Sequence, residues 1–206
     1  MGEHLQVVNR DKSMYWSLQS LDSIGGMVPV LKGSPEVADL ENTKAIQFSG
    51  LGDGLFFQEN PLKGLEEFTV ELRFRPEKGG LPEQRFLHFG YPTRDRVLFE
   101  TRLTESGDWF LDTFIASGKS ESTLFNNGFL HSTDRWYHLA LSCDGSEHIN
   151  YVDGVEEQRG AIMFQAMKGG EMSIGVRLNQ ICWFKGALAQ LTITSKSLKP
   201  TEFLLI

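Results

Sequence analysis

Residues 136–154 carry the sequence Trp-Tyr-His-Leu-Ala-Leu-Ser-Cys-Asp-Gly-Ser-Glu-His-Ile-Asn-Tyr-Val-Asp-Gly. Apolar and polar residues alternate on both sides of Asp144-Gly145, which is typical of two β-strands joined by a turn. Asp-Gly is a strong hairpin signal because glycine adopts a positive φ without steric cost. Asp153-Gly154 repeats this signal. The segment therefore predicts a buried strand, a second strand, and a tight turn into a third.

A second segment alternates even more regularly. Phe68, Val70, Leu72 and Phe74 are interleaved with charged or polar residues across residues 67–75, so one face of this strand is buried and the other is wet. A helical turn is expected after Pro200. Many short strands and few helical patterns predict an all-β protein, an antiparallel two-sheet sandwich. The remaining strands are expected at residues 14–18, 27–31, 45–48, 55–58, 85–89, 97–102, 109–115, 136–143, 148–152, 155–158, 172–174 and 187–194.

Length and composition bound the possibilities. The chain has 206 residues, 40% of them hydrophobic, and no linker or repeat interrupts it, so we expect one β-sandwich domain over residues 1–206. The net charge of −7, without a basic cluster, argues against nucleic-acid and anionic membrane partners. No apolar run reaches the roughly 20 residues that a membrane helix needs. The N-terminal residues do not resemble a signal peptide, so the chain is expected to be cytoplasmic or cut from a longer secreted precursor.

Five segments occur in the order found in one known family. Besides the hairpin segment they are Ala-Ile-Gln-Phe-Ser-Gly at residues 45–50, Phe-Thr-Val-Glu-Leu-Arg-Phe-Arg-Pro at 68–76, Met-Ser-Ile-Gly at 172–175, and Phe-Lys-Gly-Ala-Leu-Ala-Gln-Leu at 184–191. Residues 45–203 of the chain thus resemble the laminin-G-like domains of the concanavalin A-like lectin/glucanase superfamily. The resemblance implies a jelly-roll sandwich with a recognition role, and it favours a secreted or periplasmic location.

Family members often carry calcium, which needs carboxylate or carbonyl oxygens. This chain has Ala-Gln at residues 189–190, where the family usually has Asp-Glu, and Ser49 where an acid is common. Asp53, Asp144 and Asp153 remain as weak metal candidates, although turn formation also explains them. We therefore predict no cofactor, with calcium as the alternative.

The two cysteines allow two interpretations. Cys143 continues the face of Tyr137, Leu139 and Leu141, which predicts a buried side chain. It is then either a free buried thiol or the disulfide partner of Cys182, and a disulfide would indicate an oxidising compartment. Neither cysteine has the spacing of a Cys/His metal site.

The sequence contains no established catalytic motif. The nearest approach to the carboxylate signature of the superfamily's glycoside hydrolases is Glu36, Asp39 and Glu41, but on a strand their spacing would send Glu36 to the other face. Because Gly-Ser-Pro precedes them at residues 33–35, we expect a loop with solvated acids. The histidines are dispersed, and the resemblance favours a structural role for His138. We therefore predict that the chain is not an enzyme.

The candidate binding surface lies in the middle of the chain. One predicted strand carries Phe110, Asp112 and Phe114 on the face opposite its apolar side, and if the preceding strand pairs with it, Glu100 and Arg102 share that face. Sugars are bound by aromatic rings against their C–H faces and by planar polar groups at their hydroxyls. The alternative is a salt bridge between Arg102 and an acid beside a partly buried pair of phenylalanines.

Loop residues form a second candidate set, because the loops at one end of a sandwich often carry binding function. Tyr91 and Trp183 are the two that we include among the predicted ligand-binding residues. The other members of this set are Arg94, Asp95, Asn126, Asn127, Asn179 and Gln180.

Three functions remain open at this point. The first is a non-catalytic recognition module, with a glycan as its ligand. The second is an interaction or structural domain that binds a protein, which a contiguous apolar surface patch would distinguish. The third is a polysaccharide hydrolase or lyase in which Glu100 and Asp112 supply the paired carboxylates.

Overall fold

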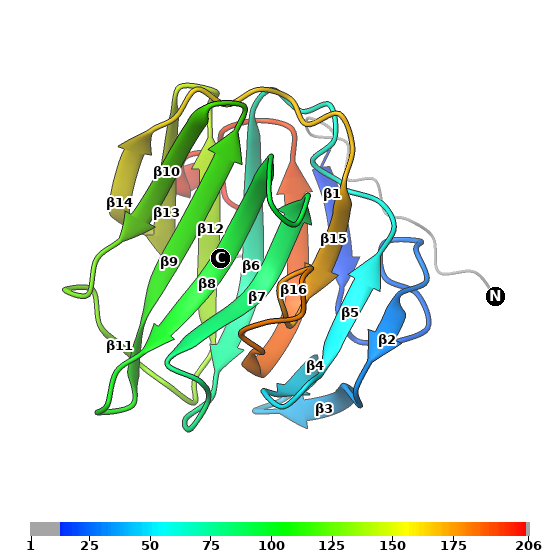
Figure 1. Cartoon of the computed structure of the whole chain (residues 1–206). Coiled ribbons are helices and arrows are strands. Elements are labelled where there is room, and N and C mark those ends of the chain that lie inside the picture. Colours follow the sequence, from blue (N-terminus) through cyan, green and yellow to red (C-terminus); the bar gives the residue numbers. More distant parts are fainter. Residues whose placement is uncertain (1–12, 205–206) are drawn as a thin grey trace.

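The computed structural model describes residues 13–204 as two β-sheets packed face to face (Figure 1). Every pairing between two strands of the described residues is antiparallel. The predicted antiparallel sandwich is therefore confirmed. The only helical element within these residues is the 3-10 turn η1 (Pro200–Glu202), at the place where a turn was expected. No helix of the described residues is long and apolar enough to span a bilayer.

The sheet that contains β6, here called the β6 sheet, has the order β14-β13-β12-β6-β16-β4-β3, with β1 also paired to β16. The predicted hairpin forms one edge of this sheet. Its strands are β1 (Ser13–Ser17), β3 (Glu36–Leu40), β4 (Thr43–Ser49), β6 (Phe68–Pro76), β12 (Tyr137–Cys143), β13 (Glu147–Val152), β14 (Val155–Ala161) and β16 (Lys185–Thr194).

The opposite sheet, here called the β8 sheet, has the order β10-β9-β8-β7-β15-β5-β2, with β11 also paired to β9. Three strands consecutive in the chain, β7, β8 and β9, form a meander at its centre. Its strands are β2 (Val30–Lys32), β5 (Gly54–Phe57), β7 (Glu83–Gly90), β8 (Arg96–Leu103), β9 (Asp108–Ser117), β10 (Ser120–Phe125), β11 (His131–Ser132) and β15 (Glu171–Ile174).

The second hairpin turn, at Asp153-Gly154, has the geometry that the sequence predicts. Asp153 and Gly154 have φ values of 48° and 75°, so both central residues of the turn between β13 and β14 are left-handed, as in a type I′ turn. The turn is also anchored to β12, because the Asp153 carboxylate accepts a hydrogen bond from the backbone N–H of His138 at 2.9 Å. The local sequence therefore determines the register of the hairpin.

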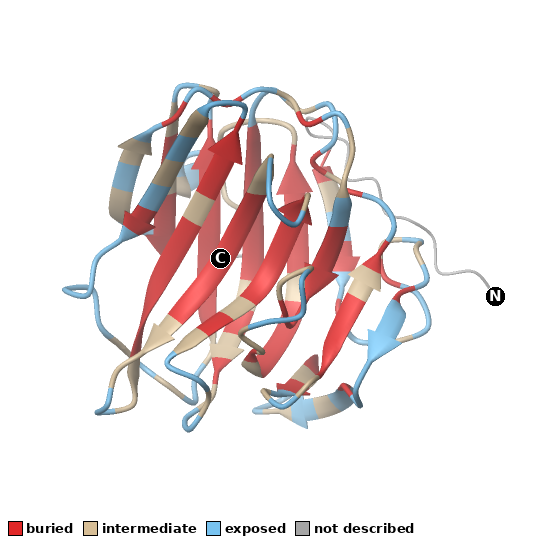
Figure 2. Ribbon diagram, in the orientation of Figure 1, coloured by how far each residue is buried: buried red, intermediate tan, exposed pale blue. Residues whose placement is uncertain are grey.

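The core lies between the two sheets and is rich in aromatic side chains (Figure 2). The alternating residues of β6 point into it, as predicted. Phe74 of β6 has its ring centroid 4.5 Å from that of Phe86, 5.1 Å from that of Trp109, and 5.4 Å from that of Phe184. Phe86 and Trp109 belong to the β8 sheet, so Phe74 joins the two layers directly.

The strands predicted from alternation are all present, but the expectation of a loop at residues 36–41 is wrong. Glu36–Leu40 forms strand β3, which pairs with β4 through a turn at Glu41 and Asn42, both with positive φ. Strand β3 lies at the edge of its sheet and is largely exposed, and edge strands tolerate charged residues that remove the apolar alternation. Strands β10 and β11 were missed for a related reason, because β10 is mostly polar and β11 has only two residues. The strand expected at residues 27–31 begins only at Val30.

The cysteines are both free thiols, so the disulfide alternative is wrong. Cys143 is buried in the core, as predicted, and burial raises the pKa of its thiol to about 11. Cys182 lies in the loop between β15 and β16, where Arg85 of β7 donates a hydrogen bond to its sulfur at 2.6 Å. His138, for which a structural role was predicted, hydrogen-bonds Glu71 at 2.9 Å on the outer face of the β6 sheet.

Candidate functional site

The predicted pairing of the two central strands is confirmed. In the register of β8 with β9, Glu100 faces Asp112, Arg102 faces Phe110, and Leu98 faces Phe114. Apart from Leu98, these are the residues for which a shared surface was predicted. They lie on the outer face of the β8 sheet, away from the core residues Trp109 and Leu111 that alternate with them.

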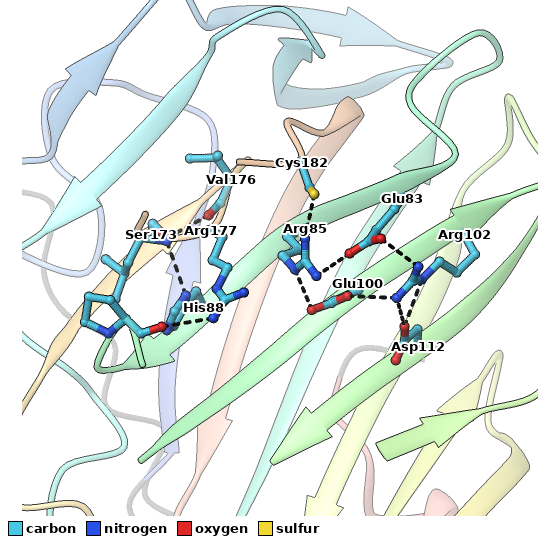
Figure 3. A network of polar contacts seen from close by, with 12 residues as sticks. Glu83, Arg85, His88, Glu100, Arg102, Asp112, Ser173, Val176, Arg177 and Cys182 are labelled. Carbon is cyan, nitrogen blue, oxygen red and sulfur yellow. Dashed lines mark hydrogen bonds and ion pairs between the residues drawn. The ribbon is translucent and has the colours of Figure 1, made fainter. Parts of the chain in front are cut away.

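Charged side chains form a continuous ladder on this face, here called the ion ladder: Glu83, Arg85, Glu100, Arg102 and Asp112 (Figure 3). Arg102 donates to Asp112 Oδ2 through Nε at 2.9 Å and Nη2 at 2.8 Å. Its Nη2 also lies 3.5 Å from Glu100 Oε2, and its Nη1 lies 2.9 Å from Glu83 Oε2. Arg85 bridges the other side, with Nε donating to Glu100 Oε1 at 2.7 Å and Nη2 paired with Glu83. The salt bridge between Arg102 and an acid, the alternative considered from the sequence, is therefore present.

The two inner acids of the ion ladder are almost fully buried, with exposures of 3% for Glu100 and 1% for Asp112. Burial raises the pKa of Glu100, which the charge of Arg85 partly offsets. Burial likewise raises the pKa of Asp112, against the hydrogen bond and charge of Arg102. Oδ1 of Asp112 is buried without a hydrogen-bond partner. Both carboxylates thus depend on neighbouring arginines for compensation of their charge.

Aromatic rings border the ion ladder. Phe110 is buried and makes an edge-to-face contact with Phe125 of β10 at a centroid distance of 5.0 Å. Phe125 is 51% exposed and has the Arg102 guanidinium 5.5 Å from its ring centroid. The ring of half-buried Phe114 lies 4.6 Å from the guanidinium of Arg96. Phe125 was missed by the sequence reasoning because β10 was not predicted, although the inward Leu124 beside it gives a short alternation signal.

A hollow of about 220 Å³ opens between these groups. Its charged lining consists of four arginines and two carboxylates: Arg85, Arg96, Arg102, Arg177, Glu100 and Asp112. Its other walls are Leu98, Phe114 and Thr123. A concave site that combines apolar rings with a few fixed polar groups is the usual form of a small-ligand site. The sequence did not point to Arg96 or Arg177. Arg96 lies one residue before the strand predicted at 97–102, and Arg177 reaches the hollow from a loop whose fold no local pattern predicts.

Two other hollows are larger but offer less for recognition. One of about 320 Å³ lies beside Asp53 and Lys185, and its single aromatic, Phe48, is fully buried and presents no ring face. The other, of about 380 Å³, lies beside Met163 and Phe164 and has no charged side chain in its lining. The hollow on the β8 sheet is therefore the candidate site.

The loop residues of the second predicted set do not form one cluster. Tyr91 lies in the turn between β7 and β8, with the Arg94 guanidinium 4.0 Å from its ring centroid and the backbone of Asp95 closing the turn. Residues 126–127 follow β10 at the opposite end of the sheet (Figure 1). Residues 179–183, which include Trp183, belong to the long loop between β15 and β16.

The three aspartates considered for calcium are occupied by other donors. Asp53 accepts the backbone N–H of Ser34 on one oxygen and that of Ser49 on the other, both at 2.8 Å. Burial opposes but does not prevent a lowered pKa for Asp53, because these hydrogen bonds favour the carboxylate. Asp144 accepts the backbone N–H groups of its own turn, and Asp153 anchors the turn described above. Residues 13–204 contain no group of three or more His, Cys, Asp or Glu side chains that could hold a metal ion.

Comparison with known proteins identifies a matching family model and several solved structures with a similar fold. A family model described as the concanavalin A-like lectin/glucanases superfamily matches residues 49–203. A search of curated proteins finds no match. Among solved structures, domain 4 of AbnA, a GH43 extracellular arabinanase from Geobacillus stearothermophilus in complex with arabinotriose, is 20% identical over 91% of this chain and 94% of its own, with a TM-score of 0.67.

Two further similar structures are parts of longer chains. The binding domain of Paraclostridial Mosquitocidal Protein 1 is 16% identical over 91% of this chain and 49% of its own, with a TM-score of 0.66. The binding domain of Botulinum Neurotoxin DC in complex with SialylT is 11% identical over 92% of this chain and 49% of its own, with a TM-score of 0.65. The present chain spans about half of each, and identities at this level establish a shared fold.

Proposed function

The chain belongs to the concanavalin A-like lectin/glucanase superfamily, and from this membership we propose that it is a non-catalytic module that binds carbohydrate over the outer face of the β8 sheet. The observation that carries the proposal is the hollow on this face, where Phe114 lines the wall beside a set of guanidinium groups and Phe125 lies against one of them, that of Arg102. A ring face suits the C–H face of a sugar, and guanidinium N–H groups suit its hydroxyl oxygens.

The similar structures support this class of ligand. AbnA domain 4 covers nearly the same length of chain and is in complex with arabinotriose. The botulinum neurotoxin binding domain is in complex with SialylT. At this level of sequence identity a shared fold does not imply a shared ligand, so experiment has to determine which sugar binds.

The state of the carboxylates favours binding over hydrolysis. Glycoside hydrolysis needs one carboxyl that donates a proton and a second that attacks or activates water, roughly 5–10 Å apart across the scissile bond. Glu100 and Asp112 both contact Nη2 of Arg102, and both are buried beneath the face on which a sugar would lie. If Asp112→Asn removed a measurable polysaccharide cleavage, the proposal of a non-catalytic module would be overturned.

A protein partner is the second candidate, and a separate observation favours it. The edge strand β2 and the residues before it expose Val28, Val30 and Leu31 at 77%, 60% and 46%. Exposed apolar side chains at a sheet edge are suited to protein contact. Loss of a captured partner on Val30→Lys, with glycan binding intact, would show that this edge has a function separate from the hollow.

The test of the proposal is a glycan array followed by calorimetric titration of any sugar that binds. Phe125→Ala is expected to raise the Kd about tenfold, equivalent to about 1.4 kcal/mol, because it removes an exposed ring face. Tyr15→Ala is the matched control, since Tyr15 is a half-exposed aromatic on β1 of the other sheet. Binding that is unchanged by Phe125→Ala and by Phe114→Ala would place the site elsewhere.

We also propose that this binding needs no metal. The array is therefore run in calcium and again in chelator, and equal binding is expected in both. Loss of binding in chelator would overturn this part of the proposal and would direct attention to Asp53, Asp144 and Asp153.

A further inference from the structure

The hollow on the β8 sheet is electrostatically asymmetric. At one end, Arg85 and Arg102 contact the carboxylates of the ion ladder. At the other end, Arg96 and Arg177 have no carboxylate within ion-pair distance among the residues that the structure describes. Two positive charges therefore line one wall of the hollow without direct compensation.

The donors of these two arginines are only partly used. Arg96 donates through Nη1 to the backbone oxygen of Arg94 at 2.9 Å, and Arg177 donates through Nη2 to the backbone oxygen of Pro92 at 2.9 Å. The Nε atom of each is buried without a hydrogen-bond partner. A buried donor without an acceptor is costly, so both side chains gain from an added acceptor that enters the hollow.

Burial and the neighbouring charges act on both guanidinium groups. Burial lowers the pKa of Arg96, and the charge of Arg177 lowers it further, while the charges of Glu121 and Glu100, which lie beyond ion-pair distance, partly offset this. Burial lowers the pKa of Arg177 as well, with a further contribution from Arg85. Buried His88 does not add to this positive field, because burial above all, and then the charges of Arg177, Arg96 and Arg85, lower its pKa to about 3 and keep it neutral.

The arrangement is held in place before any ligand binds. Nδ1 of His88 accepts the backbone N–H of Leu178 at 3.2 Å, which leaves Nε2 to donate to the backbone oxygen of Tyr91 at 3.1 Å (Figure 3 labels His88 beside Arg177). This imidazole therefore ties the loop that carries Arg177 to the turn before Arg96. The Arg96 guanidinium lies against the ring of Phe114. Groups fixed in this way lose little entropy when a ligand binds.

We propose that Arg96 and Arg177 form a subsite for an oxyanion carried by the sugar, either the carboxylate of a uronic acid or a sulfate ester. The inference rests on the proposed carbohydrate function and specifies its ligand as acidic. Guanidinium groups are planar, permanently charged and matched to carboxylate and sulfate oxygens. The Arg96 guanidinium lies over the ring of Phe114 in the wall of the hollow, so a sugar held against this pair would bring an attached acid group to the two arginines.

The experiment compares acidic and neutral versions of the same sugar. Oligogalacturonides are titrated beside their fully methyl-esterified forms, and dextran sulfate oligomers beside dextran oligomers. Tighter binding of oligogalacturonides identifies a carboxylate, and tighter binding of dextran sulfate identifies a sulfate ester. Arg177→Gln is expected to weaken binding of the preferred acidic sugar at least tenfold and to leave that of its neutral form within twofold.

The matched control is Arg159→Gln, which removes the same charge from β14 of the opposite sheet, where Arg159 is exposed. Arg96→Gln is the second site variant, and the thermal midpoint of each variant is measured to show that it is folded. Because Arg177 lies in a loop, its variant keeps the test valid if Arg96→Gln fails to fold.

The outcomes separate the subsite from the function. Equal affinity for acidic and neutral sugars, unchanged by Arg177→Gln, would overturn the anionic subsite and leave the carbohydrate function standing. Binding of acidic sugars that weakens equally in Arg159→Gln would show general charge attraction and would also overturn the subsite. No binding of any sugar, acidic or neutral, would overturn the proposed function together with the subsite.

Discussion

Arg102 is the residue on which the outer face of the β8 sheet most depends. Its guanidinium contacts Glu83, Glu100 and Asp112, and the last two are buried. A charged group on a sheet surface normally contributes little, but here its removal would leave two buried carboxylates with one fewer counter-charge. The site and the stability of the sheet are therefore coupled through one side chain.

Replacement of Arg102 should consequently destabilise the fold. We expect Arg102→Ala to lower the free energy of unfolding by about 2–3 kcal/mol, below the full value for a fully buried pair because Arg102 is itself about one quarter exposed. Urea unfolding measures this change, with the exposed Arg135→Ala as control. A loss below about 0.5 kcal/mol, the range of ordinary surface substitutions, would show that the ion ladder contributes nothing to stability.

His88 should make stability depend on pH in acid. Its pKa is lowered to about 3 in the fold from 6.5, so between these values the unfolded chain binds more protons and stability falls as the pH falls. His148, whose pKa burial lowers to about 4, acts in the same direction. In the folded state Glu100 and Asp112 act in the opposite direction, since burial raises the pKa of both carboxyls.

A variant separates these contributions. Between pH 4 and 6, the free energy of unfolding of the natural sequence should fall with acidification more steeply than that of His88→Gln, by about 1 kcal/mol per pH unit. Denaturant titrations at several pH values measure the two slopes. Parallel slopes would show that His88 is not held neutral by the fold.

At the scale of single elements, the turn between β13 and β14 offers the clearest test. Gly154 has φ of 75°, which an L side chain rarely adopts, so Gly154→Ala should cost about 1 kcal/mol of unfolding free energy. Gly128→Ala, at a loop glycine that is not among those with positive φ, is the control and should change stability less. An equal effect at both positions would mean that the turn conformation does not constrain the hairpin.

The elements also explain what the sequence could and could not predict. Strand β6 was predictable because it is central, with one buried face that enforces a period of two. Strands β3 and β10 were not, because exposed edge positions leave the choice of side chains free. That failure had a functional consequence, since Phe125 of β10 borders the candidate site and was overlooked with its strand.

Residue pairing across β8 and β9 was predictable for a different reason. Consecutive strands with a short connection form a meander, so Glu100, Arg102 and Asp112 had to meet if both strands kept their faces. Arg177 had no such constraint. It arrives from the loop between β15 and β16, about 80 residues along the chain from Arg96. Its own hydrogen bond to the backbone oxygen of Pro92, and that of the Leu178 N–H to His88, fix its position.

At the scale of the whole molecule, Phe74 should be the most sensitive core position. From the β6 sheet its ring contacts two rings of the β8 sheet and that of Phe184 before β16, so Phe74→Ala is expected to lower the free energy of unfolding by about 3–5 kcal/mol through lost burial and a cavity between the layers. Because the layers share this contact, they should unfold together. For the natural sequence and for Phe74→Ala alike, the urea midpoint from fluorescence should equal the midpoint from far-ultraviolet circular dichroism. Separate midpoints would mean that the sheets unfold independently.

The two free thiols differ in accessibility, so their alkylation can report how often the sandwich opens. Cys143 is sealed in the core, whereas Cys182 is only partly covered, so an alkylating reagent should modify Cys182 in the native protein and reach Cys143 only when the sandwich separates. Mass spectrometry of pulse-alkylated protein would then count the opened molecules directly. Because no bond between these sulfurs holds the fold together, a reducing agent can keep both thiols reduced until the alkylating pulse without altering the protein being timed.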